Sequence, residues 1–592
     1  MAACTCALVH MSGSSHRTPF VDNFKVSLST SFTPLLTTLQ QNLSRLRINS
    51  PYKSIREASV RMLDAFVDLM FEFVDDPRQP SQSNFAPVEE TGEPVEVIAV
   101  EGEIPADFTE GVYIRNGANP VHGGLKSAVS IFGKTSCVWI EGEGMLHAVY
   151  FKREASGNWT ITYNNRYVET ETYLLEKEKN RPYILPAIEG NPSAVLMSFL
   201  LNSLRIGTPN KLYSNTSIIE HAGAFYSVAE NHCPQKIDIR TLETLGNWSI
   251  GGAWTRPFTS HPKKAPGSGE LVIIGTDAKK PYIEVGVVSA DGTKLVHKVD
   301  LKFERSIVSH EIGVTQRYNV ILNFPIILDV NRVLKGGSLI KYEEGKYSSI
   351  GVMPRYGNSD SVLWFPVETG CVYHLINCYE NGDDEVVVMG CKARESFIPG
   401  PDFGLDKFEW FSRGLKHVDE CGENMDQDGK LFSRAYEWRL NMKTGEVKEG
   451  YLTGTEFAVD FPLINPKFTG IENKYAYTQV VDSTASAAAG IVKYSGLAKL
   501  FLHERHVELS RAKVEYHMFP ANTYCSGAAF VSKSGATEED DGWIIAFVHD
   551  EDTDNSQVYI VDAKNISGEL VAKIGLQSRV PYGFHGIFSS FG

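Results

Sequence analysis

Residues 538–563, EEDDGWIIAFVHDEDTDNSQVYIVDA, contain two short apolar runs separated by a polar turn. The runs GWIIAFVHD and SQVYIVDA are rich in valine, isoleucine and aromatic residues, which predicts β-strands. The same pattern recurs from about residue 93 onward, between turns of glycine, asparagine or aspartate. Many short strands at regular spacing predict an all-β propeller or sandwich, and the lack of a crisp repeat argues against a WD40-type array. Further examples are GVYIRNG (111–117), HAVYF (147–151), ELVIIGT (270–276) and EVVVMG (385–390).

The N-terminal region does not follow this pattern. It is rich in Ser, Thr, Lys and Arg, and Asp22 is the only acidic residue between Met1 and Arg56. Such a leader resembles a chloroplast transit peptide, and a plain disordered tail is the alternative. We therefore expect three parts: a leader or tail at 1–50, an amphipathic helix region at 51–83, and a single all-β domain, a propeller or sandwich, with helical insertions at 84–592.

Three segments carry helical patterns. In SIREASVRMLDAFVDLMFEFVDD (54–76), apolar residues recur at helical spacing after a capping serine. The segment AVLMSFLLNSLRIG (194–207) has a similar apolar character. Helices of this kind lie in a membrane interface or pack on their own protein, and the sequence leaves both open. The pair favours peripheral membrane contact through residues 54–75 and 194–207. A third helix is predicted at 484–502, TASAAAGIVKYSGLAKLFL, as an insertion in the β plan.

The totals describe a globular protein without nucleic-acid chemistry. Of 592 residues, 42% are hydrophobic and 22% charged, and the formal net charge is −15. This charge argues against a nucleic-acid partner, because neutralising phosphates needs a surplus of Lys and Arg. No run of about 20 apolar residues predicts a transmembrane helix. Nine cysteines without a Cys-x-x-Cys pair predict reduced thiols in a cytosolic or plastid compartment.

Four of the sixteen histidines are distinguished by their context. Three of these four are flanked by apolar residues on short predicted strands, and a buried imidazole needs a partner for each nitrogen, which a metal and an outer acceptor supply. The first two steps between them are 49 and 64 residues, about one propeller blade each, so they can converge on the central axis. Four neutral imidazoles suit iron(II), and zinc, copper and nickel also bind imidazole. The four are His261 in TSHPKKAPGSGEL, His310 in SIVSHEIGVTQ, His374 in CVYHLINCYE and His585 in VPYGFHGIF.

The blocks around these histidines resemble the carotenoid cleavage oxygenase family. The matching segments include SHPKKAPGSGE, SHEIGVT, LWFPVETGCVYHLINCYENGDDEVV, DFPLINPKFTG and PYGFHGIF, and together with others they cover about residues 84–592 in order. The resemblance implies a seven-bladed β-propeller with a helical dome over a substrate tunnel. It also implies that His261, His310, His374 and His585 bind one iron(II), which leaves positions open for dioxygen without 2-oxoglutarate.

The family places glutamates behind three of the histidines, and this chain departs from that pattern. Glu230, in SVAENHCPQKID, stands in the first position and is expected to support His310. The second position holds Asp460, one methylene shorter, so its support of His374 is either direct or through a water. In the third position stands Gly527, so we expect His585 to lack its acceptor. A missing outer partner typically costs about 10–100-fold in metal affinity or activity.

The resemblance implies a dioxygenase that cleaves a conjugated C=C bond of a carotenoid or apocarotenoid to two carbonyl products. Such a substrate is an apolar polyene, so tunnel length and aromatic lining must select the bond. The EGEGMLH block and the altered glutamates resemble the zaxinone synthase branch. The alternatives are cleavage of a phenylpropanoid or stilbene, and a catalytically impaired propeller that binds carotenoids. We expect a plastid location at a membrane surface, with the cytosol as the alternative, and infer no obligate protein partner.

Overall fold

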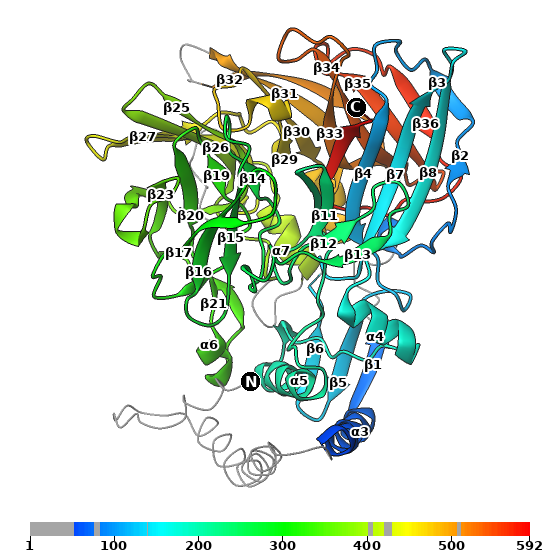
Figure 1. The fold of residues 1–592 in the computed structure, drawn as a ribbon, viewed down its shortest axis with the longest axis vertical. Helices are drawn as coiled ribbons and strands as arrows, with labels where there is room; N and C mark the ends of the chain where they lie inside the picture. The colour runs from blue at the N-terminus through cyan, green and yellow to red at the C-terminus, as the bar shows by residue number, and fades with distance from the viewer. Residues whose placement is uncertain are drawn as a thin grey trace.

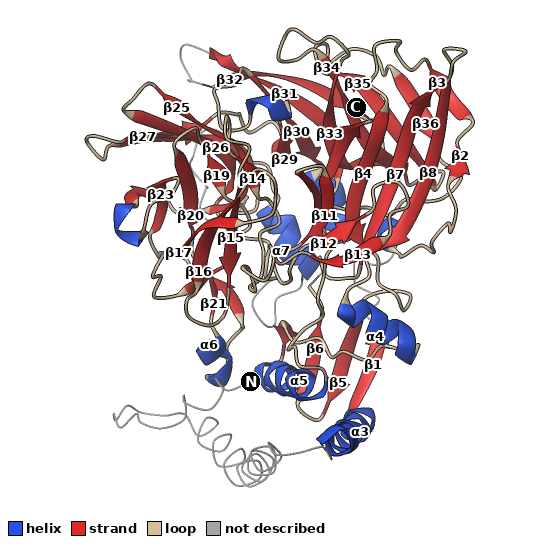
Figure 2. Ribbon diagram, viewed as in Figure 1, coloured by secondary structure: helices blue, strands red, loops and turns tan. Residues whose placement is uncertain are grey.

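The computed structural model describes residues 52–75, 83–138, 140–400, 407–418, 429–505 and 511–591. Strands dominate it (Figure 2), and they form a seven-bladed β-propeller. The strands of each blade are given from the innermost outward. Blade 1 consists of β37 (Gly586–Ser590), β4 (Gly111–Ala118), β7 (Gly144–Arg153) and β8 (Trp159–Tyr167), extended by β2 (Val95–Glu96), and blade 2 of β10 (Ser217–His221), β11 (Ala224–Val228), β12 (Gln235–Ile237) and β13 (Thr244–Asn247). Blade 3 consists of β14 (Lys263–Lys264), β15 (Leu271–Thr276), β16 (Ile283–Val288) and β17 (Leu295–Asp300), and blade 4 of β19 (Gly313–Val314), β20 (Tyr318–Asn323), β23 (Ser348–Pro354) and β24 (Leu363–Val367).

The last three blades follow in chain order. Blades 6 and 7 share one sheet, because Tyr494 of the sixth pairs with Cys525 of the seventh. Blade 5 consists of β25 (Cys371–Asn381), β26 (Glu385–Ala393), β27 (Arg434–Asn441) and β28 (Val447–Tyr451). Blade 6 consists of β29 (Ala458–Leu463), β30 (Tyr475–Val481), β31 (Tyr494–Arg505) and β32 (Ala512–Met518). Blade 7 consists of β33 (Thr523–Ser532), β34 (Gly542–Asp550), β35 (Asn555–Asp562) and β36 (Ala572–Gly575), extended by β3 (Ala99–Gly102).

The two ends of the ring are joined by the last strand. β37 pairs antiparallel with β4, with Gly586 opposite Arg115, so the C-terminus completes the first blade. Figure 1 shows this end, in red, beside β4. Apolar side chains fill the space between neighbouring blades: Val320 and Ile350 of blade 4 pack with Val388 and Trp438 of blade 5. The central strands of these blades are therefore buried on both faces, which explains apolar runs such as EVVVMG in the sequence.

A cap covers one face of the propeller. Helices α3, α5 and α6 and strands β1, β5 and β6 lie together at the bottom of Figure 1. The cap contains sheet as well as helix, and no described helix is long and apolar enough to cross a bilayer. Its elements are α3 (Tyr52–Met70), α4 (Glu171–Lys179), α5 (Pro192–Arg205) and α6 (Val330–Leu334), the sheet of β1 (Phe71–Asp75), β5 (Lys126–Ser130), β6 (Gly133–Ser136) and β9 (Glu189–Gly190), and the sheet of β18 (Ser306–Ile307), β21 (Ile326–Leu328) and β22 (Ile340–Tyr342).

The first helical prediction is right for its N-terminal part and wrong beyond it. Helix α3 ends at Met70, and Phe71–Asp75 form strand β1, which pairs with β5 of the cap. In this sheet β1 is an edge strand, and all five of its residues pair with β5. The second prediction, at 194–207, corresponds to α5. The predicted leader at 1–50 lies outside the described residues.

The predicted helix at 484–502 is mostly wrong. Helix α8 spans only Ser483–Ala489, and Gly490 ends it in the left-handed region at φ 65°. The chain then enters β31, where Leu497 and Leu500 are buried between strands. The charged Lys499 is also fully buried there. The two short helices that lie among the blades are α8 and α7 (Lys407–Gly414), and single 3₁₀ turns occur at Ser83–Phe85, Ser359–Ser361 and Pro466–Phe468.

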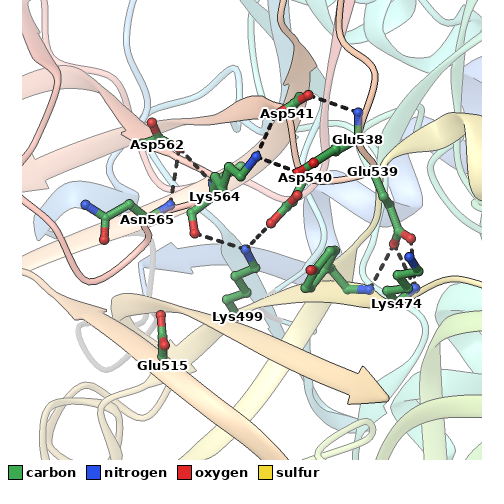
Figure 3. Close-up of polar contacts among 12 residues, drawn as sticks. Lys474, Lys499, Glu515, Glu538, Glu539, Asp540, Asp541, Asp562, Lys564 and Asn565 are labelled. Carbon is green, nitrogen blue, oxygen red and sulfur yellow. Dashed lines mark hydrogen bonds and ion pairs between the residues drawn. The ribbon is translucent and has the colours of Figure 1, made fainter. Parts of the chain in front are cut away.

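An ion pair explains how Lys499 is accommodated in β31. Its Nζ lies 2.7 Å from Oδ2 of Asp540 and donates to the carbonyl of Lys564 at 3.1 Å (Figure 3). Lys564 in turn contacts Glu538 and Asp541 at the surface. Tertiary pairing therefore overrides the helical propensity of the local sequence, because the strand is paired on both sides.

Candidate metal centre

The structure brings the four predicted histidines together on the propeller axis. Their candidate ligand atoms all lie within 4.8 Å of one another. Nε2 of His261 is 3.0 Å from Nε2 of His310, and the ring centroids of His261 and His585 are 4.2 Å apart. Each histidine stands on or just before the innermost strand of a blade: His585 before β37, His261 before β14, His310 before β19, and His374 within β25.

Local irregularities of the strands aim these rings at the axis. His261 forms an isolated parallel bridge with Glu311, which places the segments before β14 and β19 side by side. The pairing of β25 with β26 shifts register on both sides of Leu375, so a bulge lies beside His374. Bulges commonly redirect side chains near functional sites. The backbone of His585 is held between Thr216 and Asn116 by hydrogen bonds of 3.2 and 3.1 Å.

Carboxylates hold the outer nitrogens of two of the four rings. Glu230, which follows β11, contacts Nδ1 of His310 through Oε1. Oδ1 of Asp460, on β29, lies 2.7 Å from Nδ1 of His374 and also accepts the Phe461 N–H at 2.8 Å. The shorter side chain of Asp460 thus reaches its histidine directly, without a bridging water. In both pairs the carboxylate fixes Nδ1 as the protonated nitrogen and leaves Nε2 facing the axis.

Among the described residues, no carboxylate holds the ring of His585 in this way. Within the described part of the chain its ring makes no side-chain hydrogen bond, and it stacks instead on Phe461 with centroids 4.4 Å apart and an interplanar angle of 17°. Phe461 adopts φ 52°, an unusual conformation for a residue with a side chain. Gly527, the residue at the third predicted position, has φ 70° and lies against the Arg115 side chain. The expectation that His585 lacks an outer acceptor therefore agrees with this geometry.

Arg115 is a buried cation near Gly527. Its guanidinium donates to Oγ of Ser526 at 2.8 Å and lies 5.2 Å from the centre of the Phe547 ring. Nε and Nη2 are buried and have no hydrogen-bond partner. Burial lowers the pKa of Arg115 to about 10, because desolvation disfavours the charged form. A family carboxylate at position 527 would meet this cation rather than open space.

The electrostatics of the site favour neutral rings at two positions and a polarised ring at a third. Burial, with neighbouring histidines and Lys263, holds the pKa of His261 and of His585 well below its usual value. Burial also lowers the pKa of His310, but the Glu230 carboxylate outweighs this and the net shift is upward. Burial raises the pKa of Glu230, and the adjacent His310 more than offsets it, so that the net shift is downward.

The residues present fit a cation on the axis. Nε2 of His374 is buried without a hydrogen-bond partner, although its ring is anchored by Asp460. An orphaned imidazole nitrogen aimed at three other imidazoles is costly unless a metal binds there. A second candidate group among the described residues is acidic and consists of Glu538, Asp540 and Asp541. It differs from the histidines because lysines already pair with its members (Figure 3).

Two cavities that share Val492 in their walls are lined by residues in contact with the histidines. One is lined by Phe461, Tyr494 and Phe584, next to His585. The other is lined by Tyr373, Asp460 and Phe397, next to His310 and His374. Pockets that bind apolar ligands commonly have aromatic walls of this kind, with a small number of polar groups among them. Glu141 is one of the polar residues in the wall of the first cavity, and burial raises its pKa to about 7.

Comparisons with known proteins identify the family. The family model described as "Retinal pigment epithelial membrane protein" matches residues 85–590. The chain belongs to the carotenoid cleavage oxygenase family. It is similar to the carotenoid 9,10(9',10')-cleavage dioxygenase of Crocus sativus, with 29% identity over 572 residues, covering 93% of this chain and 96% of the relative. It is 30% identical over 547 residues to carotenoid 9,10(9',10')-cleavage dioxygenase 1 of Arabidopsis thaliana, covering 90% of this chain and 94% of the relative.

Solved structures support the fold of this carotenoid cleavage oxygenase. A variant of the Synechocystis apocarotenoid oxygenase superposes with a TM-score of 0.67 at 19% identity, covering 87% of this chain and 99% of that one. The lignostilbene dioxygenase of Pseudomonas brassicacearum gives 0.69 at 20% identity, covering 87% and 100%. At these identities the likeness concerns the fold alone. The cobalt-substituted Synechocystis protein gives 0.67 at 19% identity, covering 86% and 99%.

Sequence reasoning missed three residues that shape the site. Arg115 lies in the predicted strand GVYIRNG, and nothing local shows that its charge is buried. Phe461 stands in the DFP block, next to a residue that was predicted. Glu311 directly follows His310 in SHEIGVT, and its proximity to a candidate ligand is the one signal that could have drawn attention to it.

Proposed function

We propose that this chain is an iron(II)-dependent dioxygenase that cleaves one conjugated C=C bond of an apocarotenoid or carotenoid to two carbonyl products. The observation that carries the proposal is the convergence of His261, His310, His374 and His585 beside two aromatic cavities. These four residues would hold the ion through Nε2. When bound, iron(II) supplies the redox chemistry toward dioxygen that organic side chains lack.

The protein's own residues have three tasks in this reaction. Glu230 and Asp460 keep the Nδ1 protons of His310 and His374 in place, so that both rings present Nε2 to the axis. The aromatic walls exclude water and orient the polyene. Because the polyene has no polar handle along its length, the bond beside the histidines is set by how deeply the substrate enters.

A finer assignment concerns the branch and the location. Glu141, the first residue of the EGEGMLH block at 141–147, lies in a cavity wall. This block, Asp460 and Gly527 together support a zaxinone-synthase-like activity on apocarotenals. A plastid location is supported by the rice relative "9-cis-epoxycarotenoid dioxygenase NCED1, chloroplastic", 29% identical over 528 residues. Membrane contact is supported by α3, where Met62 and Leu69 are 62% and 81% exposed on one helix face.

The test is anaerobic loading of the purified chain with iron(II), followed by dioxygen, an apocarotenal and mass spectrometry of the carbonyl products. We expect about one iron per chain and two carbonyl fragments, and loss of both in His310→Ala. Stilbene given in parallel discriminates the alternative substrate class. Substrate binding without iron uptake or product would instead assign an impaired carotenoid-binding propeller and refute the proposal.

A further inference from the structure

Glu311, which directly follows His310, is a buried carboxylate that contacts the segments of His261 and His374. It is 2% exposed. Its Oε1 pairs with Nζ of Lys263, and its Oε2 accepts the N–H of Leu375 at 2.6 Å. Lys263 follows His261 by two residues, and Leu375 follows His374 by one. One carboxylate, itself next to His310, therefore joins the segments of three candidate ligands.

The contact with Leu375 explains the bulge in β25. In a regular antiparallel ladder the backbone N–H groups alternate between bonding the partner strand and pointing away from it. The register of β25 shifts on both sides of Leu375, and the Leu375 N–H turns to Glu311. A buried N–H needs an acceptor, so loss of the carboxylate would favour return to a regular register. Such a return would rotate the neighbouring His374.

The segments of His261 and His310 are also joined to each other through Thr259 and through a backbone bridge, neither of which involves β25. Oγ1 of Thr259 donates to the His310 carbonyl at 3.0 Å and accepts the His261 N–H at 3.2 Å. The His261–Glu311 bridge adds a backbone contact between the same two segments. The side chain of Glu311 thus links this pair to Leu375, the residue that directly follows His374.

Charge gives Glu311 a second effect. The Lys263 ammonium stands near the candidate ligands, and a lone cation there would repel a divalent ion. Glu311 neutralises it at contact distance. Its two carboxylate oxygens are already used by Lys263 and Leu375, so Glu311 is not free to bind the ion itself.

We propose that Glu311 and Lys263 form a positioning pair that sets the mutual spacing of His261, His310 and His374 for metal binding. The inference rests on the proposed metal-dependent function and adds the residues that organise its centre. It predicts that the pair affects metal affinity and ligand geometry, not only folding.

The variants separate the two contacts of Glu311. Glu311→Gln keeps an oxygen for Leu375 but loses the ion pair, whereas Glu311→Ala loses both. Co(II) serves as the probe, measured by calorimetry and by its visible absorption spectrum, which reports coordination geometry. We expect Glu311→Gln to weaken Co(II) binding about tenfold and Glu311→Ala more, with a changed spectrum. Lys263→Met combined with Glu311→Gln should recover part of the affinity, because the uncompensated cation is gone.

A matched control is the Lys499–Asp540 pair, a buried ion pair between blades 6 and 7 (Figure 3). Asp540→Asn should lower the unfolding temperature of the apo protein and leave Co(II) affinity unchanged. If the Glu311 variants behave like this control, with normal Co(II) affinity and spectrum, the positioning role is refuted. If the wild-type chain binds no Co(II), the proposed metal centre itself fails, and this inference fails with it. Should Glu311→Ala not fold, the Gln variant and the double variant decide.

Discussion

Substitution of Gly527 by alanine tests whether the third outer carboxylate could return to this site. Gly527 lies in β33 at φ 70°, where the ladder with β34 shifts register. A Cβ built there would lie 2.2 Å from Cγ and 2.4 Å from Cδ of Arg115. These atoms are in the middle of a side chain, whose guanidinium is confined on its other side by Gly583. Neither the backbone nor Arg115 can yield cheaply.

The magnitude follows from two independent costs. A non-glycine residue in the left-handed region costs about 1–2 kcal/mol. Forcing a methyl group against a buried side chain costs about 1–3 kcal/mol more. We therefore expect Gly527→Ala to lower the free energy of unfolding by roughly 2–5 kcal/mol, a large fraction of the stability of an ordinary domain. Gly527→Glu should be worse and should not supply His585 with an acceptor.

Urea unfolding followed by circular dichroism measures this loss. Gly535→Ala is the matched control, because Gly535 has φ 75° and open space where its Cβ would lie. It carries only the backbone cost, about 1–2 kcal/mol. Adding Arg115→Ala to Gly527→Ala removes the side chain that the new methyl group meets. The steric part of the stability loss should then disappear, and a double-mutant cycle isolates that part. Equal destabilisation by the two glycine substitutions would refute the steric argument and reopen position 527 to a carboxylate.

Three other predictions concern the ligand shell, a buried acid and the cap. Asp460→Ala should weaken Co(II) binding about 10–100-fold, because the His374 ring loses its 2.7 Å partner; calorimetry checks this, and undiminished affinity would remove Asp460 from the site. Burial raises the pKa of Glu141 to about 7 from 4.5, so the folded state holds its proton more tightly and stability falls as pH rises through that window. The loss is about 1.4 kcal/mol per pH unit, and Glu141→Gln should abolish it in urea titrations at several pH values; an unchanged profile would contradict the assignment. Met62→Ser with Leu69→Ser should reduce co-sedimentation with anionic vesicles several-fold, whereas Leu245→Ser, at an exposed leucine of blade 2, should not.

The sequence was informative about the site where one residue acts through its own chemistry. The four histidines and Glu230 stand in recognisable blocks, and the structure gathers them as those blocks predict. Asp460 was assigned to His374 with its mode of contact left open, and the structure makes that contact direct. The reach of a side chain depends on backbone placement to within about one bond length, which composition and spacing do not specify.

The sequence misled where a long-range partner decides the outcome. The alanine-rich segment after Ser483 has helical propensity, and it becomes strand from Tyr494 because neighbouring strands pair with it on both sides. Lys499 can be buried in that strand only because Asp540, 41 residues later, neutralises it. Propensity is a local property worth less than about 1 kcal/mol per residue, and the burial of a whole strand outweighs it.

His585 shows why the loss of an outer carboxylate need not leave a ligand loose. Its backbone is held by Asn116 and Thr216, because the last strand closes the ring directly after it. Its ring is restrained by the stacked Phe461, which adopts φ 52°. The N–H of Phe461 donates to the Asp460 carboxylate, which also holds His374. One aspartate thus organises two rings, by a hydrogen bond to one and through the following phenylalanine to the other. The remaining difference is electronic. Among the described residues the His585 imidazole has no outer carboxylate acceptor, so it is a weaker donor to a metal than His310 and His374, whose rings Glu230 and Asp460 hold.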